Sequence, residues 1–273
     1  MTSALITVAE LQALDPRPVL IDATWNLAGP PGREAYDAGH LPGAHFVDLD
    51  TELAAPPGPG RHPLPDATTV TALTRRTGVS AQTPVVVYDA ANSLAAARAW
   101  WVLRYFGVAD VRVLDGGLAA WRAAGGEVTT DVPADRDSDF TATPGHLPLV
   151  DAEGAAKVAA GGVLLDARAP ERFAGEVEPM DKVAGHIPGA VNTPMAALLT
   201  PDGHFKTPEE LQAYFTAHGV TPDTELATYC GSGVTATHTA LALTTLNIQA
   251  PVYIGSWSDW ITDPTRPTAT GPA

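Results

Sequence analysis

The sequence predicts an α/β protein with two tandem domains, each a mostly parallel sheet flanked by helices. Short apolar segments alternate with helical ones: Val85–Tyr88 precedes residues 94–106, and Leu226–Tyr229 precedes residues 234–246. Strands that are apolar on both faces are typical of parallel sheets covered by helices on either side. The same series of elements also occurs twice along the chain, and a polar segment separates the two copies.

Four short elements recur in the same order in the two halves, which indicates an internal duplication. The first half contains residues 19–23 (VLIDA), 38–44 (AGHLPGA), 85–90 (VVVYDA) and 115–121 (DGGLAAW). The second half contains residues 163–167 (VLLDA), 184–190 (AGHIPGA), 226–230 (LATYC) and 255–260 (GSWSDW). The interval from Asp22 to His40 is 18 residues, and the matching interval from Asp166 to His186 is 20 residues.

The polar, proline-bearing segment 130–139 separates the two copies and is typical of a linker. We therefore expect a first domain over residues 1–129, a linker over residues 130–146 and a second domain over residues 147–273.

Composition and charge narrow the range of partners. The chain has 273 residues, a formal charge of −15 and a sequence pI of about 4.7, which argue against nucleic acid or an anionic membrane as a partner. No apolar run approaches the roughly 20 residues of a membrane helix, and no basic stretch precedes an apolar core at the N-terminus. With one cysteine there is no intrachain disulfide. We expect a cytoplasmic protein.

Cys230 is the only cysteine in the sequence, and it lies between an expected strand and an expected helix. It follows Leu226–Tyr229, and glycines occupy positions 231 and 233. Glycine lets consecutive backbone N–H groups point toward the sulfur, and the start of the helix adds partial positive charge. Both effects stabilise a thiolate, the nucleophilic form of cysteine. The alternative is that Cys230 is a small buried apolar residue, as many free cysteines are.

The residues around Cys230 exclude several other chemistries. A cysteine phosphatase has an arginine six residues after its cysteine, where this sequence has Ala236. A nucleophile elbow around Ser232 would need glycines at the positions of Cys230 and Val234. One cysteine cannot form a Cys-x-x-Cys redox pair, and the histidines lack metalloprotease spacing. We therefore expect one activated thiolate and no metal or organic cofactor.

The first half lacks this thiol. Its matching position is Asp89, and a carboxylate cannot act as a sulfur nucleophile. Ligands of parallel sheets bind at the carboxyl ends of the strands, where Cys230 is expected. We therefore expect the first domain to be catalytically silent and to contribute a wall beside Cys230.

Other residues of the repeat have structural interpretations. His40 and His186 occur in both halves, including the half without a thiol, and are expected to be structural. Asp22 and Asp166 end strands and are expected to hold loops. Arg168 would equally suit an ion pair that anchors a loop. Core or domain-packing positions are expected for Trp121, Trp257 and Trp260.

The repeated elements and the closing motif resemble the tandem-domain rhodanese family of sulfurtransferases over essentially the whole chain. Residues 39–44 and 185–190 are similar to the N-terminal motif of that family, and residues 255–260 are similar to its C-terminal motif. The resemblance implies two rhodanese-like domains, of which the first carries Asp89 at the cysteine position. It also implies sulfur transfer through a persulfide on Cys230.

The loop around the cysteine resembles the branch of the family that uses 3-mercaptopyruvate. Thiosulfate sulfurtransferases typically carry basic residues after the cysteine, whereas Gly231 and Ser232 are neutral. In the 3-mercaptopyruvate branch, a serine two residues after the cysteine is paired with an aspartate and a histidine from the first domain. The matching residues here are Ser232, Asp50 and His62.

The resemblance also implies how the donor and the persulfide are bound. Arg172 matches the arginine that clamps the donor. Backbone N–H groups from the loop would hold the anionic persulfide, and the residues concerned are Gly231, Gly233, Val234 and Thr235.

The sequence departs from this branch ahead of the second Gly-His motif. A second substrate arginine usually follows a Glu-Pro pair there, but Glu178 and Pro179 are followed by Met180, Asp181 and Lys182. Lys182 could supply a positive charge, although an ammonium group lacks the two-pronged fit of a guanidinium to a carboxylate.

Together these features lead us to expect ping-pong sulfur transfer. The Cys230 thiolate takes sulfur from 3-mercaptopyruvate, pyruvate leaves, and Ser232 with His62 and Asp50 relays the proton that pyruvate needs. The acceptor is expected to be a thiol, such as a small thioredoxin-like protein, or cyanide. Two alternatives remain at this point: thiosulfate as the donor, and a non-catalytic module that carries a persulfide made elsewhere.

Overall fold

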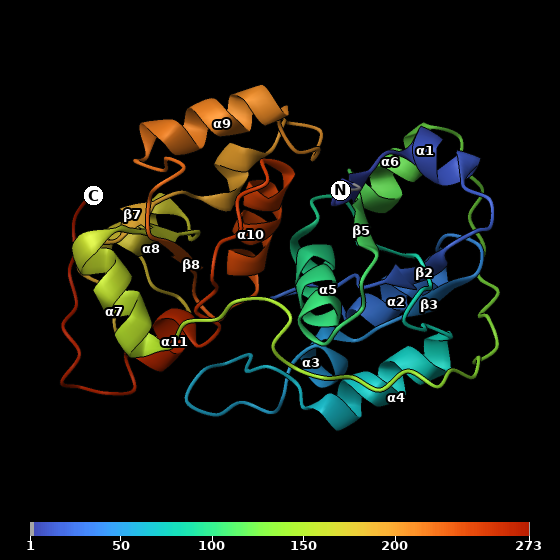
Figure 1. Cartoon of the computed structure of the whole chain (residues 1–273), viewed down its shortest axis with the longest axis horizontal. Helices are drawn as coiled ribbons and strands as arrows, with labels where there is room; N and C mark the ends of the chain where they lie inside the picture. Colours follow the sequence, from blue (N-terminus) through green and yellow to red (C-terminus); the bar gives the residue numbers. More distant parts are fainter. Residues whose placement is uncertain (1–2, 273) are drawn as a thin grey trace. The chain divides into compact units, whose positions relative to one another are not determined.

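The computed structural model describes residues 3–272 and divides into two compact units. The first unit contains the chain up to Ala55, together with Leu64–Leu147 and Pro201–Phe205. The second unit contains Pro56–Pro63, Pro148–Thr200 and the chain from Lys206 onward. The segment 56–63 therefore belongs to the second unit, although it lies in the first half of the sequence. Each unit has its own sheet (Figure 1).

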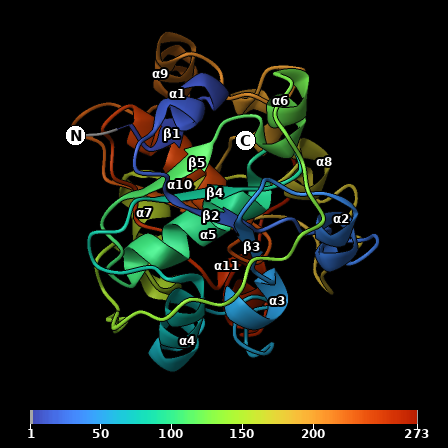
Figure 2. The same ribbon diagram turned by 90° about the vertical axis from the view of Figure 1, so that its right-hand side faces the viewer.

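The first unit is built around a parallel sheet whose described strands lie in the order β1-β5-β4-β2-β3 (Figure 2). The strands are β1 (Leu5–Ile6), β2 (Val19–Asp22), β3 (Ala44–Phe46), β4 (Val85–Tyr88) and β5 (Val111–Leu114). The helices are α1 (Val8–Ala13), α2 (Gly32–Ala38), α3 (Leu49–Glu52), α4 (Ala67–Thr77), α5 (Leu94–Tyr105) and α6 (Gly117–Ala123). Helix α5 packs against β4 and β5.

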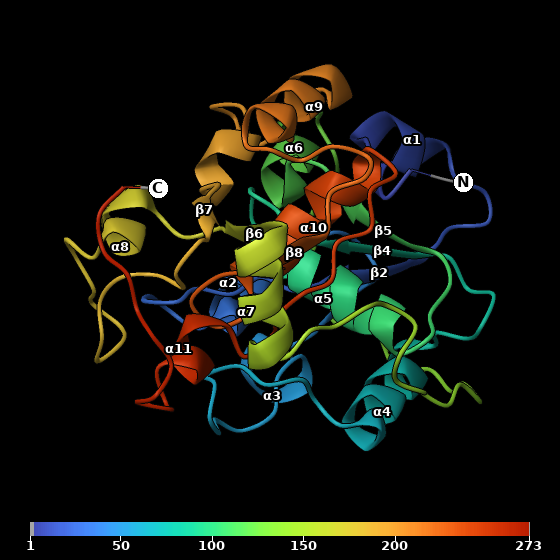
Figure 3. The ribbon, with the colours of Figure 1, turned by 60° about the vertical axis from the view of Figure 1, so that its left-hand side comes forward.

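The second unit has the parallel strand order β7-β6-β8 in the described chain (Figure 3). Its strands are β6 (Val163–Asp166), β7 (Val191–Asn192) and β8 (Leu226–Tyr229). Its helices are α7 (Ala152–Gly161), α8 (Pro170–Ala174), the 3₁₀ helix η1 (Met195–Leu198), α9 (Pro208–Ala217), α10 (Thr235–Thr245) and α11 (Ser256–Trp260). Helix α7 packs on β6 and β8, and α10 packs on β8.

Isolated bridges extend the second sheet in the same order as the first. Val252 pairs in parallel with Thr228 of β8 and with Leu149 on its other side. The series Leu149, Val252, β8, β6, β7 thus repeats the series β1, β5, β4, β2, β3. The predicted fold class, two tandem α/β domains with mostly parallel sheets, is confirmed.

The local sequence explains why these elements form. Strands β4 and β8 are buried along their whole lengths, as expected for central strands covered on both faces. Several helices begin at a side-chain cap: Asp66 accepts the N–H of Thr69 at α4, and Asp151 accepts the N–H of Gly154 at α7. The helices expected over 94–106 and 234–246 are α5 and α10.

The two Gly-His motifs form the same contacts in the two units. His40 Nδ1 lies 2.8 Å from the Tyr36 carbonyl oxygen and its ring stacks on Tyr36, with ring centroids 3.7 Å apart. His186 repeats both contacts with Phe173, at 2.8 Å and 3.7 Å. The rings are buried, and each links the motif to a helix, which supports the structural interpretation of both histidines.

Buried tryptophans lie where core residues were expected. Trp121 belongs to a hydrophobic cluster of the first unit with Leu20, Val86 and Leu114. Trp257 and Trp260 belong to a cluster of the second unit that also contains Phe173 and Tyr229.

Candidate active site

Cys230 is placed by the end of β8, the position at which parallel sheets bind ligands. Its side chain is buried, and the residue is 1% exposed. The Gly233 N–H donates a hydrogen bond to the Cys230 sulfur at 3.1 Å. The Gly233 N–H is one of the backbone groups that the glycines were expected to turn toward the sulfur.

The first residues of α11 hold the backbone of the cysteine loop. The Cys230 N–H donates to Ser256 Oγ at 3.1 Å, and the same hydroxyl lies 3.9 Å from the Cys230 sulfur. The Trp257 N–H donates to the Cys230 carbonyl at 3.0 Å, and the Ser258 N–H donates to the Gly231 carbonyl at 2.9 Å. The closing motif thus fixes the backbone of the cysteine loop.

Gly233 is required for the shape of the loop. Its φ of +80° lies in the left-handed region, where a side chain is strained. A Cβ at this position would lie 2.3 Å from the Ile254 carbonyl oxygen. Only glycine therefore lets this N–H point at the sulfur of Cys230.

Ser232 and His62 lie together in the second unit. The Ser232 hydroxyl is 2.8 Å from Nδ1 of His62, although the two residues are 170 positions apart in the sequence. Ser232 is buried and follows Cys230 by two residues. A hydroxyl next to an imidazole can pass a proton in either direction, with roles set by the tautomer of the ring.

Asp50 belongs to the first unit and lies in α3. Its Oδ2 accepts a hydrogen bond from Trp25 Nε1 at 3.0 Å. The partnership of Asp50 with His62, which the resemblance implies, remains a prediction.

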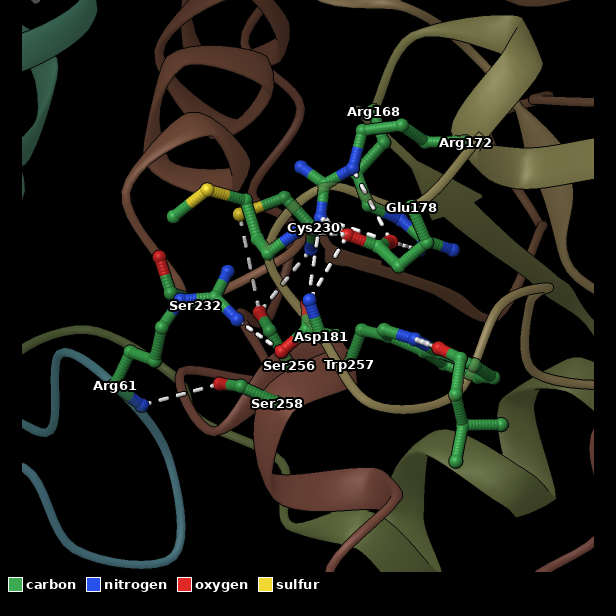
Figure 4. A network of polar contacts seen from close by, with 12 residues as sticks. Arg61, Arg168, Arg172, Glu178, Asp181, Cys230, Ser232, Ser256, Trp257 and Ser258 are labelled. Carbon is green, nitrogen blue, oxygen red and sulfur yellow. Dashed lines mark hydrogen bonds and ion pairs between the residues drawn. The ribbon is translucent and has the colours of Figure 1, made fainter. Parts of the chain in front are cut away.

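Arg172 takes part in a network of arginines and carboxylates (Figure 4). Its Nη2 donates to both Glu178 oxygens, at 2.7 and 3.0 Å, and lies 3.3 Å from Asp181 Oδ2. Burial opposes ionisation of Glu178, but the hydrogen bonds from Arg172 and from the backbone lower the pKa of that carboxyl below its usual value. Lys182, whose ammonium group could supply a positive charge near the position of the second arginine, is exposed.

Arg61 is a member of this network that the sequence analysis missed. Its guanidinium pairs with Asp181, and its backbone N–H donates to Ser258 Oγ at 3.1 Å. A Cβ on Gly231 would lie 2.9 Å from Arg61 Nη2 and 3.4 Å from Arg172 Nη1, so both guanidinium groups lie against the loop residue after Cys230. The available signal was that Arg61 directly precedes His62.

Arg168 anchors a loop. It is buried, donates to both Asp166 oxygens at 2.6 to 3.1 Å, and donates to the Gly185 carbonyl at 2.8 Å. These contacts favour the structural interpretation of Arg168 and Asp166.

In the first unit, Asp89 occupies the position that Cys230 has in the second. Its buried carboxylate accepts four backbone N–H groups at 3.0 to 3.2 Å, from Ala91, Ser93, Ala95 and Ala96. Burial raises the pKa of Asp89, while these N–H groups act in the opposite direction. Backbone N–H groups thus hold a carboxylate at this point of the first unit, and at the matching point of the second unit the Gly233 N–H contacts the Cys230 sulfur.

The chain belongs to the rhodanese-like family. Its sequence matches the rhodanese-like domain twice, over residues 7–124 and 151–263. The tandem organisation predicted from the repeat is therefore that of two rhodanese-like domains.

Relatives that align along the whole chain include proteins named as sulfurtransferases. A Mycobacterium tuberculosis protein assigned as a thiosulfate sulfurtransferase, SseB, is 47% identical over 98% of each chain. A Pseudomonas aeruginosa protein assigned as a 3-mercaptopyruvate sulfurtransferase is 45% identical over 99% of this chain and all of its own. The crystal structure of Escherichia coli SseA, a 3-mercaptopyruvate sulfotransferase with the rhodanese fold, superposes with a TM-score of 0.84 at 34% identity, covering 94% of this chain and 99% of SseA.

These comparisons confirm that the chain is a sulfurtransferase of the rhodanese family. They name two different donors among relatives of nearly equal similarity, so the donor has to be argued from the residues of the site. No helix within residues 3–272 is both long and apolar enough to cross a membrane.

Proposed function

We propose that this protein transfers sulfur from 3-mercaptopyruvate, through a persulfide on Cys230, to a thiol or cyanide. The observation that carries the proposal is the Ser232 hydroxyl at 2.8 Å from His62 Nδ1, two residues after the nucleophile. The relatives named for 3-mercaptopyruvate in Pseudomonas aeruginosa and Escherichia coli support the same donor.

The first half-reaction needs a proton as well as a nucleophile. The Cys230 thiolate attacks the donor sulfur, the carbon–sulfur bond breaks, and its electron pair passes to the enolate of pyruvate. Ser232 gives a proton to the enolate carbon, and through His62 it regains the proton that the donor thiol loses when the persulfide becomes an anion. Pyruvate then leaves. Asp50 is proposed to orient His62. Thiosulfate releases sulfite, which leaves as a stable anion, so a proton relay of this kind benefits 3-mercaptopyruvate more.

The loop after Cys230 holds the new persulfide. The N–H groups of Gly231, Gly233, Val234 and Thr235 are proposed to face the outer sulfur, which carries the negative charge. Arg172 is proposed to bind the donor carboxylate through its two-pronged guanidinium.

The second half-reaction returns the enzyme to its thiolate. A thiol of a thioredoxin-like protein, or cyanide, attacks the outer sulfur, and the electron pair of the sulfur–sulfur bond passes back to Cys230. The neutral side chains of the loop and a net charge of −15 suit an acceptor that arrives without a large anionic surface. We place the protein in the cytoplasm, where reduced thiols are abundant.

Steady-state rates with both donors on one preparation test this proposal. We expect kcat/KM for 3-mercaptopyruvate to exceed that for thiosulfate by about two orders of magnitude, or about 2.7 kcal/mol of barrier. Equal or reversed preference would favour thiosulfate as the donor. If the protein turns over no donor but accepts a persulfide from another enzyme, the alternative of a non-catalytic persulfide carrier is favoured.

A further inference from the structure

The residue that takes the place of the missing second arginine is Arg61. We infer that Arg61 and Arg172 together form the anion-binding site for the sulfur donor, and that Asp181 is the resident anion which the donor displaces. The inference rests on the proposed function and names a donor-binding residue that lies far from Arg172 in the sequence.

The first support is position. Both guanidinium groups approach Gly231: a Cβ there would meet Arg61 Nη2 at 2.9 Å and the Arg172 Nη1 and Nη2 atoms at 3.4 and 3.5 Å. Gly231 is bonded to Cys230, so a donor whose sulfur reaches the thiolate has its anionic group close to both cations. The absence of a side chain at position 231 leaves room for this approach.

The second support is the anchoring of Arg61. Its backbone N–H donates to Ser258 Oγ at 3.1 Å, and the Ser258 N–H donates to the Gly231 carbonyl at 2.9 Å. The neighbouring Gly60 is packed against the Gly255 carbonyl, 3.1 Å from where its Cβ would be. The segment that carries Arg61 is therefore fixed to the same turn that fixes the cysteine loop.

The third support is the distribution of exposure and pairing in the network. The side chains of Arg61 and Arg172 are 24% and 19% exposed, whereas those of Asp181 and Glu178 are 5% and 4% exposed. The cations can thus be reached from solvent while their carboxylate partners are covered. The Nε atom of Arg61 is buried and has no hydrogen-bond partner among the described residues, so one donor of this guanidinium is unused.

Asp181 is the member of the network that a donor can replace. It contacts both arginines, while Glu178 holds Arg172 through two oxygens and also accepts the N–H groups of Met180 and Asp181. Burial raises the pKa of Asp181 by more than the two arginines lower it, whereas the pKa of Glu178 is lowered. The ionised form of Asp181 is therefore less stabilised than that of Glu178. A donor carboxylate or sulfonate-like group can make the same contacts to both guanidinium groups.

The test measures persulfide formation without an acceptor, as a second-order rate constant from intact mass. Arg61→Gln should lower the constant about tenfold for 3-mercaptopyruvate and about a hundredfold for thiosulfate, because a dianion loses more than a monoanion when one cation is removed. Arg61→Lys keeps the positive charge but lacks the two-pronged guanidinium. Its rate constants should lie between those of the parent protein and those of Arg61→Gln. Asp181→Asn should raise both constants, and that for thiosulfate more.

The matched control is Lys157→Gln. It removes the same charge from the same unit, at an exposed position of α7 where Lys157 pairs with Glu225, and should leave both constants within twofold. If thiosulfate reacts too slowly, sulfate serves as an unreactive dianionic competitor against 3-mercaptopyruvate.

The outcomes separate this inference from the proposed function. If the unmodified protein takes no sulfur from either donor, the proposed function fails. If it does, but Arg61→Gln changes neither constant or lowers both by the same factor, Arg61 only supports the loop and the inference is wrong. Should Arg61→Gln melt far below the parent protein, Asp181→Asn decides: unchanged or lower constants with a folded variant reject Asp181 as the displaced anion.

Discussion

The Ser232 hydroxyl lies 2.8 Å from Nδ1 of His62, which a loop of the first half of the sequence brings to the second unit. Ser232 is two residues from Cys230, so one short loop carries the nucleophile and a group able to supply a proton. This arrangement matches the two needs of a donor that leaves as an enolate: attack at sulfur and protonation at carbon.

The contact predicts a donor-dependent loss of activity. Ser232→Ala and His62→Gln should each lower kcat with 3-mercaptopyruvate about a hundredfold, because the enolate loses its proton source. With thiosulfate the same variants should stay within about threefold, since sulfite needs no proton to leave. Steady-state assays with both donors check this. Equal losses with both donors would mean that the pair holds the loop instead of delivering a proton.

Persulfide formation on Cys230 gives a second prediction. Treatment with donor in the absence of acceptor should add one sulfur, about 32 Da, to the intact protein, and excess cyanide or thiol should remove it. Cys230→Ser should show neither the added mass nor turnover, because no other cysteine exists in the chain. Turnover by the serine variant would contradict a covalent intermediate.

Local sequence pattern was enough to predict the fold, and it also indicates Cys230 as the candidate nucleophile. The two-sided apolar strands, the repeated Gly-His motifs and the glycines after Cys230 each act within a few residues, and each has the predicted structural consequence. The sheet order repeated by Leu149 and Val252 follows from the same duplication. The environment of Asp89 also has a local origin, because the turn into α5 directs backbone N–H groups at its carboxylate.

The arginine network could not be predicted in this way. Arg61 contacts Asp181 across 120 positions of sequence, and it belongs to a segment that folds with the opposite half of the chain. Neither the hydrophobic periodicity of the sequence nor the spacing of its motifs indicates a contact between residues so far apart. The sequence offered only Lys182 as a cation near the missing arginine, without the two-pronged fit of a guanidinium, and that side chain is exposed. The guanidinium groups that lie against Gly231 are those of Arg61 and Arg172.

The Asp89 cradle predicts an effect on stability and little effect on activity. Asp89→Asn replaces two carboxylate oxygens, each of which accepts two N–H groups, by one oxygen and one NH₂ group that cannot accept. We expect a loss of about 1–3 kcal/mol in the free energy of unfolding, from buried N–H groups left without acceptors. Denaturant unfolding at pH 7.5 measures it.

Activity of the Asp89→Asn variant should remain within about threefold of the parent protein at a temperature where both are folded. A loss of about three orders of magnitude, or about 4 kcal/mol of barrier, in a folded variant would show that the first domain is not catalytically silent.

Gly231 gives the last prediction, because its missing side chain is what lets two guanidinium groups approach the residue after the nucleophile. In Gly231→Ala the new Cβ would lie 2.9 Å from Arg61 Nη2 and 3.4 Å from Arg172 Nη1. Side-chain ends can shift, so the fold should persist while the guanidinium groups move away. We expect KM for 3-mercaptopyruvate to rise about tenfold, with kcat within threefold, since the Ser232–His62 pair is not displaced. Gly58→Ala is the matched control: it adds the same methyl group to the segment that carries Arg61, where nothing lies within 4 Å of the new Cβ, and should leave KM unchanged. A fall in kcat at constant KM would show instead that the methyl group disturbs the sulfur cradle and that the two arginines do not bind the donor.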